Sequence, residues 1–521
     1  MGFSGSSVTH LLQKGGFNHS PSQDSILETS MVEASRNINL HTGGREKRGG
    51  TAKVYGAAIT GTPRIRGIHH FAKKNGTSFV VITTNDGKIF SGNATVLKTG
   101  LATGVRSSFV TFKDKVYVSN KSNKVQTWDG VAGATSDLGT YPADWGTGSP
   151  LQIVAHGKQN SQRLWAIGVS GFEENVYISA NNTDDFGTTP LVFNIATGDQ
   201  NGLVGGVDFG DRLILFSRNR AFLVNDTDAS SANWGYSEAQ WYGGAANHNL
   251  IIQTPNDLIA MAVDGDIYSV STAQEYGDYK AASLTRPAFI HEWIKENVDL
   301  SVITTEFHGT YDPTLRAIKI FVKRLGVANI DTALVYFIDR PAEEAWMIHT
   351  NADAASGYDA SASCWGPDTA GTLYLLTGDY AGNVWKLEQA VKSDNAVGFK
   401  SILRMPAWSF GNTRNQKQFH RGHIITKGTG TVNASVRVYV DGEYKAVEGV
   451  SFSGTGDVFG TGLFGTATYG GRSLTQGSFE ARFIGTRIQF EVFNNVAGED
   501  LYVAGVMTDF KELGVKPGWS K

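Results

Sequence analysis

A glycine-rich run, GTGLFG from Gly460 to Gly465, has the spacing of the loop that binds the pyrophosphate of dinucleotides. In such a site the loop follows a strand and opens a helix, and the N-terminus of that helix meets the pyrophosphate. The residues around this run, SFSGTGDVFG and TATYGGRS, contain no helical pattern. We therefore interpret the segment 454–471 as a glycine-rich loop and expect no nucleotide cofactor.

Aspartates cluster in three short segments, NNTDDFG, VNDTDAS and DGD, which are candidates for calcium binding. Their members are Asp184 and Asp185, Asp226 and Asp228, and Asp264 and Asp266. Calcium needs six or more oxygen ligands around a tight loop, and none of the segments has the EF-hand spacing with a glutamate at its twelfth position. Asp-Gly pairs are also preferred in hairpin turns, where they adopt positive φ. The sequence therefore predicts turns rather than a metal site.

Two pairs of adjacent glutamates, Glu173-Glu174 and Glu343-Glu344, are candidates for the acid and base of a glycosidase. That chemistry needs two carboxylates that face each other at ~5–9 Å. Adjacent residues of a strand point to opposite faces, so neither pair forms such a site by itself. We interpret both pairs as parts of solvated turns.

Two pairs of histidines lie close in the sequence, His69 with His70 and His420 with His423. A zinc-binding helix of the His-Glu-x-x-His type needs two histidines four residues apart. The single His-Glu pair of the chain, at His291, has no second histidine at that spacing. These patterns predict no zinc site.

Cys364 is the only cysteine, which excludes a disulfide within the chain and a metal site made of cysteines alone. We interpret it as a small buried hydrophobic residue beside Trp365. Neither a Gly-x-Ser-x-Gly elbow nor a P-loop occurs. The sequence thus predicts no catalytic residue, no cofactor and no metal, and we expect the protein not to be an enzyme.

The 521 residues carry 46 Lys and Arg against 49 Asp and Glu, a near balance of charge. This balance argues against a protein whose main task is to grip duplex DNA through its phosphates. The 62 glycines and the aromatic fraction of 11% favour many tight turns between strands. No stretch approaches the ~20 apolar residues needed to span a membrane. We expect neither a membrane span nor a signal peptide.

One design recurs between residues 55 and 390: a β-branched or aromatic run, a turn, and a second short strand. Seven such units begin at Ser78, Ser108, Arg163, Asp211, Asp257, Ala317 and Thr372. Each unit pairs a nearly continuous apolar strand with an alternating one, as expected for an inner and an outer strand. The period of ~45 residues lies in the range of β-propeller blades. We predict an all-β protein with a propeller of about six to eight blades; the alternative is stacked β-sandwiches.

The segment RPAFIHEWIKENVDL interrupts the β pattern. Pro287 stands where a first helical turn would begin, and Phe289, Ile290, Trp293 and Ile294 recur at helical spacing. The spacing predicts one amphipathic helix packed on the propeller.

The ends of the chain differ from the repeats. Residues 1–54 are polar and rich in glycine, and they end in the basic run HTGGREKRGGTAK, so we predict an extended N-terminal arm before the 55–390 propeller domain. After the propeller, the long alternating strands SVRVYVDGEYKAV and RFIGTRIQFEVFNN predict a C-terminal β-sandwich with a Pro/Gly tail over 391–521.

The order of these units resembles one family, the β-propeller tail-hub proteins of short-tailed bacteriophages, also called nozzle or DNA-stabilising proteins. Four stretches carry the resemblance: LVGGVDFGDRLILFSRNRAFLV, NLIIQTPNDLIAMAVDGDIYSVS with the helix at 287–297, YDPTLRAIKIFVKR…TALVYFIDRPAEEAWMIHT with its aromatic Trp346, and GDYAGNVWKLE. It covers most of residues 40–515. The arm GGREKRGG departs from the Arg-Pro-Gly segment common near the N-termini of this family.

The resemblance implies a structural virion protein of the phage tail, made in the host cytoplasm and assembled as a homo-oligomer. A ring of identical subunits, expected to be six, would lie below the head-to-tail adaptor or connector. It would contact other tail proteins such as fibres or spikes. The ring would form a channel that retains packaged DNA, without sequence specificity, and conducts it at ejection. Interfaces in such a ring are heterologous and close by rotation.

Three segments are candidates for assembly contacts: the basic arm, the glycine-rich loop and the C-terminal tail. Their candidate residues are Arg45, Lys47, Arg48, Gly460, Gly462, Lys516 and Trp519. Two other functions remain alternatives. A propeller glycoside hydrolase or lyase needs acidic and aromatic side chains that converge at the channel mouth, and a carbohydrate- or peptide-binding propeller needs an exposed aromatic patch on one face.

Overall fold

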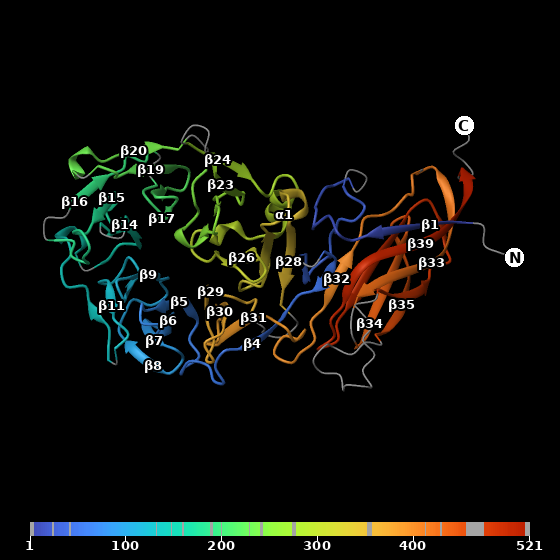
Figure 1. The fold of residues 1–521 in the computed structure, drawn as a ribbon, viewed down its shortest axis with the longest axis horizontal. Coiled ribbons are helices and arrows are strands. Elements are labelled where there is room, and N and C mark those ends of the chain that lie inside the picture. The colour runs from blue at the N-terminus through green and yellow to red at the C-terminus, as the bar shows by residue number, and fades with distance from the viewer. Residues whose placement is uncertain are drawn as a thin grey trace.

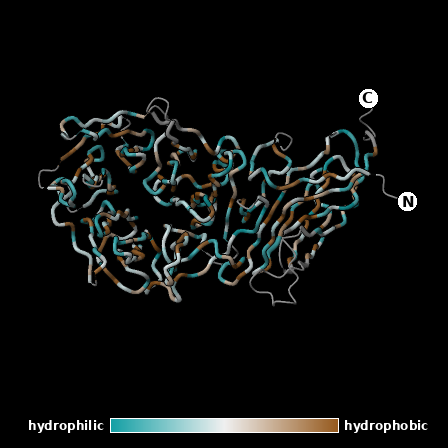
Figure 2. Tube along the Cα trace, viewed as in Figure 1, coloured by the Kyte–Doolittle hydropathy of each residue, from teal (hydrophilic) through white to brown (hydrophobic). Residues whose placement is uncertain are grey.

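A β-propeller lies beside a β-sandwich in the computed structural model of the chain (Figure 1). Short hydrophobic stretches are spread over both parts (Figure 2). The structure describes residues 5–22, 26–40, 43–131, 133–146, 148–158, 161–187, 191–198, 201–228, 230–239, 243–273, 278–351, 357–411, 413–427, 430–454 and 474–515. Within these ranges, every helix is too short or too polar to cross a lipid bilayer.

Seven antiparallel sheets of four strands, counted over the described residues, form the propeller blades. The first four blades, each given from its axial strand outward, are β5 (Ile65–Ala72), β6 (Ser78–Thr84), β7 (Lys88–Ser91), β8 (Thr95–Lys98); β9 (Ser108–Phe112), β10 (Lys115–Ser119), β11 (Gln126–Trp128), β12 (Ser136–Asp137); β13 (Gln152–His156), β14 (Arg163–Val169), β15 (Phe172–Ile178), β16 (Leu191–Asn194); and β17 (Gly205–Phe209), β18 (Arg212–Phe216), β19 (Ala221–Asn225), β20 (Gly235–Glu238).

The last three blades complete the circle. They are β21 (Ile251–Gln253), β22 (Leu258–Met261), β23 (Ile267–Ala273), β24 (Asp278–Ser283); β25 (His308–Asp312), β26 (Ala317–Val322), β27 (Thr332–Phe337), β28 (Trp346–Thr350); and β29 (Ala362–Pro367), β30 (Leu373–Gly378), β31 (Val384–Gln389), β4 (Gly50–Lys53). Each axial strand contacts the axial strand of the next blade, and β29 contacts β5. The prediction of an all-β propeller with six to eight blades is confirmed.

The blades form because their middle strands are mostly apolar and are buried on both faces. All six residues of β26 are buried, and so are the four residues of β18 from Leu213 to Phe216. Such strands pack against the blades on either side, which is why they read as continuous hydrophobic runs. Tight turns connect the strands: Gly210 and Asp211, with φ of 59° and 66°, join β17 to β18. Positive φ at both residues matches the twist of a two-residue hairpin.

The last blade takes its outermost strand from the other end of the domain. β4 pairs antiparallel with β31, with Lys53 opposite Trp385 and Ala52 opposite Lys386. The propeller is therefore closed by a strand that precedes its first blade in the sequence, and the outer edge of β31 is covered.

The C-terminal sandwich consists of two sheets. One contains, in order, β32 (Ser401–Arg404), β38 (Ile488–Asn494), β34 (Gly430–Val440) and β35 (Glu443–Gly454). The other contains β2 (Ile38–Asn39), β3 (Arg45–Lys47), β39 (Tyr502–Val515), β33 (Asn415–Lys427) and β36 (Leu474–Glu480), with β1 (Ser6–Leu11) on β39 and β37 (Ile484–Gly485) on β33. A sandwich after the propeller agrees with the prediction, but three of its strands come from the N-terminus.

The prediction of an extended N-terminal arm over residues 1–54 is therefore wrong for the described part of that segment. Its strands β1, β2 and β3 belong to the sandwich, and β4 belongs to the propeller. These strands are short and polar, so their sequence carries no period-2 pattern. The strands β1 and β3 pair with β39, β4 pairs with β31, and β2 pairs with β3. The strands β31 and β39 lie more than 300 residues away in the sequence.

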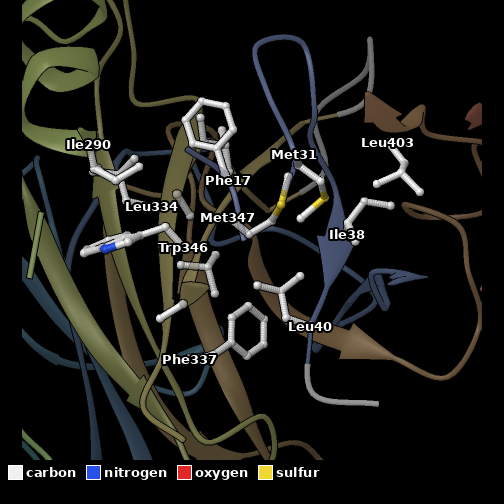
Figure 3. Close-up of a cluster of buried hydrophobic side chains, with 14 of the residues drawn as sticks. Phe17, Met31, Ile38, Leu40, Ile290, Leu334, Phe337, Trp346, Met347 and Leu403 are labelled. Carbon is white, nitrogen blue, oxygen red and sulfur yellow. The ribbon is translucent and has the colours of Figure 1, made fainter. Parts of the chain in front are cut away.

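One hydrophobic core runs across the junction of propeller and sandwich. The N-terminal segment fills the space between blade β25–β28 and strand β32 (Figure 3). The labelled side chains of this core are Phe17, Met31, Ile38, Leu40, Ile290, Leu334, Phe337, Trp346, Met347 and Leu403. Each of these side chains is at most 2% exposed. The apolar residues of the N-terminal segment therefore pack against both domains and join them.

The predicted helix is present as α1 (Ile290–Asn297), and it buries Ile290, Trp293 and Ile294. It begins three residues later than expected, because Phe289 adopts a left-handed conformation with φ of 58°. Short 3-10 turns lie at Ala143–Trp145, Ser231–Asn233, His248–Leu250, Leu300–Val302 and Ala342–Glu344.

Candidate functional site: the axial cavity and the domain junction

The axial strands of the propeller bring polar residues together at one rim. Arg106 lies just before β9, and its Nη2 donates to the carbonyl oxygens of Glu306 (2.5 Å) and Ser361 (2.8 Å). Glu306 precedes β25 and Ser361 precedes β29. The starts of three axial strands therefore meet around one guanidinium group.

A cavity of about 470 Å³ lies inside this rim. Its polar lining includes Arg66, His69, Arg106, His248 and His308. It also contains Cys364 and Trp365, with Cys364 half-buried as part of a mainly apolar cluster. Burial raises the pKa of the Cys364 thiol to about 12, so it stays protonated and unreactive at neutral pH.

Three arginines surround a single carboxylate at the rim. Arg64 forms an ion pair with Glu306, and Arg66 Nη1 lies 3.2 Å from Glu306 Oε1. Although burial opposes ionisation, the bond to Arg64 and the charges of Arg66 and Arg106 hold the pKa of Glu306 below its usual value. Counting only these four groups, the rim carries an excess of two positive charges.

The cavity histidines are neutral at physiological pH. Burial lowers the pKa of His69 and of His248 to about 4. Burial and the nearby charge of Arg106 also hold the pKa of His308 well below its usual value. The lining therefore offers neutral imidazoles and fixed guanidinium charges, which suit binding of a polar ligand rather than proton transfer near pH 7.

A buried histidine also links two neighbouring blades. His156 Nδ1 lies 2.8 Å from Asp208 Oδ1, and its Nε2 lies 3.2 Å from Asp226 Oδ2. Burial lowers the pKa of this imidazole, but the two carboxylates more than offset the effect and raise the pKa to about 9. Asp226, which the sequence placed in a turn, is thus also part of an ion pair between blades.

A second polar cluster is buried at the domain junction. The guanidinium of Arg48 binds both carboxylate oxygens of Asp394, at 2.8 and 2.6 Å, and both side chains are fully buried. Arg48 also lies over the ring of Phe399, 3.8 Å from its centroid. A charged pair this deep is stable only when both partners keep their hydrogen bonds.

Glu388 of β31 belongs to the same polar cluster, and its carboxylate accepts several hydrogen bonds. Its Oε1 accepts from Lys319 (2.5 Å) and from the hydroxyl of Tyr358 (3.0 Å), and its Oε2 accepts from Asn39 (3.0 Å). Although burial opposes ionisation, Lys319 and His349 hold the pKa of Glu388 well below its usual value. The cluster joins the N-terminal segment to two blades.

The three basic residues expected at an assembly surface are internal. Arg45 donates to the carbonyl of Leu12 (2.9 Å), and Lys47 Nζ donates to Asn494 Oδ1 (2.8 Å). Arg45, Lys47 and Arg48 are all fully buried. In this fold they have no surface to present to another subunit, so their assignment as assembly contacts is wrong. A short basic run looks solvated in the sequence, whereas Lys47 and Arg48 bind Asn494 and Asp394, which lie hundreds of residues away.

The other four candidates, Gly460, Gly462, Lys516 and Trp519, lie outside the described residues, as does the GTGLFG run.

The aspartate turns behave as expected from turn chemistry. Asp185 Oδ1 accepts from the backbone of Gly187, Asp228 Oδ1 from Ser230, and Asp264 Oδ1 from Asp266. In the described ranges, no group of three or more His, Cys, Asp or Glu side chains has a metal-binding arrangement.

The glutamate pairs differ in part from the expectation of solvated turns. Glu173 and Glu174 lie in β15, where Glu173 pairs with Lys121 at 3.1 Å. Glu343 and Glu344 lie in a 3-10 turn. His69 and His70 are both in β5, and they line the axial cavity together with Cys364.

Sequence reasoning missed Arg66, Arg106, His248, Glu306 and His308. A signal was present, because each stands at or just before the start of an axial strand. Aligning the repeats on their first strands, rather than on the more apolar second strands, would have placed these residues in one register.

No protein-family profile and no curated protein matches the chain. Among solved structures, the chain is similar to two β-propeller structures, the computationally designed protein Ika8 and BBS1N in complex with ARL6DN. The Ika8 alignment covers 64% of this chain and 98% of that chain, at 10% identity and a TM-score of 0.34. The BBS1N alignment covers 66% and 98%, at 10% identity and a TM-score of 0.41. The sheet order of this chain itself defines its seven-bladed propeller.

Proposed function

We propose that this chain is a structural subunit of the tail of a short-tailed bacteriophage. It forms a ring of identical subunits, a tail hub or nozzle, which retains packaged DNA and conducts it at ejection. The proposal starts from the sequence resemblance described above.

The observation that best supports a structural role is the fixed attachment of sandwich to propeller. The N-terminal segment contributes strands to both domains, and the pair of Arg48 with Asp394 is fully buried where it passes between them. A subunit that surrounds a channel must keep its two parts in one orientation while DNA passes. A shared core and a buried ion pair provide that rigidity, because removing one partner of a buried ion pair costs ~3–5 kcal/mol.

The charge of the chain fits a conducting channel better than a tight DNA-binding protein. With a formal net charge of −3, the subunit offers little general attraction for DNA phosphates.

The lining of the axial cavity favours the structural proposal over a glycosidase. Its described residues present arginine and histidine side chains instead of two facing carboxylates.

The test is to locate the protein in the phage particle by electron microscopy. A short peptide tag inserted after Leu325, a residue that is 55% exposed in the turn between β26 and β27, gives a label for antibody fragments. The expected result is a ring of label at the tail, below the head-to-tail adaptor. The tagged protein, purified alone, should melt at the same temperature as the untagged chain, which controls for damage by the insertion.

Particles that lack the protein, or label found only away from the tail, would overturn the proposal. Mass photometry of the isolated subunit is the weaker measurement, since assembly can require the connector. Adding the purified connector to the same sample should convert monomers into a ring on the connector.

A further inference from the structure

We propose that the axial cavity of the propeller is a binding site for a small oxyanion, a phosphate or carboxylate group, held by Arg106, His248 and His308. The site lies within a single propeller, so the inference is independent of the proposed ring and of DNA.

The first observation is a set of polar atoms without protein partners. Neither ring nitrogen of His248 has a hydrogen-bond partner among the described residues, and the same holds for His308 Nε2 and Arg106 Nε. His308 is 3% exposed, yet it belongs to the cavity lining. Buried polar groups are nearly always satisfied, because an unpaired one costs ~1–3 kcal/mol. Their concentration around one cavity indicates that a bound group completes them.

The second observation concerns which of these atoms are donors. A neutral imidazole always carries one N–H, so His248 has an unpaired donor in either tautomer. For His308, Nδ1 lies 3.3 Å from Arg106 Nη2, which can only donate. The carbonyl of Glu306, the other neighbour of Nδ1, is slightly farther away at 3.4 Å and also accepts the shorter bond from Arg106. Arg106 thus favours the tautomer with the proton on Nε2, and that N–H is free for a ligand.

The third observation is the charge of the rim. Arg64, Arg66 and Arg106 face one carboxylate, Glu306, as described above. Arg64 and Arg66 share the side chain of Glu306, whereas Arg106 contacts only its backbone carbonyl. The guanidinium of Arg106 therefore lacks a carboxylate of its own, and the imidazoles of His248 and His308 line the same cavity. An anion would neutralise the charge of Arg106 and accept from the histidine donors at the same time.

The same lining disfavours a cation. The guanidinium charges repel metal ions, and the nearest carboxylate is already paired. The volume of about 470 Å³ lies within the range of small-molecule sites, roughly 300–1,000 Å³. The cavity can hold a small molecule that carries an oxyanion group, together with water. One wall is aromatic, where the ring of Phe109 stacks on His69 with centroids 5.4 Å apart.

The test is isothermal titration of the full chain with inorganic phosphate at constant ionic strength. Separate titrations with acetate and citrate distinguish a phosphate from a carboxylate ligand, and sodium chloride measures the non-specific effect of salt. We expect saturable binding of at least one of the oxyanions and none of chloride. The melting temperature should rise with the same concentration dependence.

Two variants locate the binding. Arg106→Met keeps the length of the side chain and removes its charge, and it should weaken binding about tenfold or more. His248→Asn changes a side chain that has no protein hydrogen bond to lose, so it should fold even if Arg106→Met does not, and it should weaken binding severalfold. Arg316→Met is the matched control, because Arg316 is a surface arginine that pairs with Asp339. Its affinity should equal that of the wild type.

The proposal is overturned if none of the oxyanions binds more tightly than ~1 mM. It is also overturned if phosphate binds equally well to His248→Asn and to the wild type, since the ion would then sit elsewhere. An equal response to chloride would identify general salt stabilisation and would exclude the site.

Discussion

Replacing Arg48 with methionine removes the guanidinium that fastens the N-terminal segment between propeller and sandwich. The group is fully buried and donates five hydrogen bonds. Two go to the carboxylate of Asp394, and the others go to Asn37 Oδ1 (3.0 Å) and to the carbonyls of Gly49 (2.8 Å) and Thr350 (3.1 Å). Methionine fills much of the same space but satisfies none of these acceptors.

The expected loss of unfolding free energy is about 3–5 kcal/mol, the range found when one partner of a buried ion pair is removed. Most of it arises because the carboxylate of Asp394 stays buried without a counter-charge. A double-mutant cycle adds a second substitution, Asp394→Asn, which leaves a neutral amide at that position. The double variant should therefore lose less than the sum of the two single losses, which would measure the coupling of the pair.

Urea unfolding followed by tryptophan fluorescence measures these losses, since Trp385 and Trp408 are buried on either side of the junction. Limited proteolysis within residues 1–54 reports separately whether the segment is released. The control is Arg316→Met, whose ion pair with Asp339 is more than half exposed, so the unfolding midpoint should stay close to that of the wild type. If Arg48→Met is no more destabilising than this control, the pair does not hold the domains together.

Three further results are expected. The free energy of unfolding should fall by up to ~3 kcal/mol as the pH rises from 6.5 through 9, because the pKa of His156 is raised in the folded protein. The contribution of His156 is fully present below pH 6.5. In melting experiments at a series of pH values, His156→Gln should show no such loss. Deleting residues 1–54 should give aggregates in size-exclusion chromatography, because the edge of β31 is uncovered. Gly422→Ala should lower the melting temperature, because its Cβ would lie 2.0 Å from the ring of Phe479, whereas Gly449→Ala, in open space, should not.

Much of the fold could be predicted from local patterns. The middle strands of the blades are buried on both faces, so β18 and β26 appear in the sequence as mostly apolar runs, with Lys319 as the one charged residue inside β26. The turns between strands carry glycine and aspartate where positive φ is required, as at Gly210 and Asp211. The helix α1 could be predicted because its buried residues recur at helical spacing. It begins at Ile290, later than the sequence predicts, because Phe289 adopts a left-handed conformation.

The rim of the axial cavity was not visible in the same way. Arg106, His248 and His308 each stand alone in the sequence, without the short spacing that marks a metal or nucleotide motif. They meet because a propeller places the starts of all its axial strands around one axis. A site assembled from separate blades leaves no local motif, so only the closed ring shows that these residues share a cavity.

An all-β fold with repeated blades and a following sandwich could be predicted from the sequence alone, because those features depend on hydrophobic periodicity and on turn residues within short windows. The place of the described residues before position 55 depends on long-range contacts. Their strands are short, and their polar and charged side chains look solvated until Asp394, Glu388 and Asn494 are brought beside them. Burial of a charge depends on its partner, and here the partners are 300 to 450 residues distant in the chain.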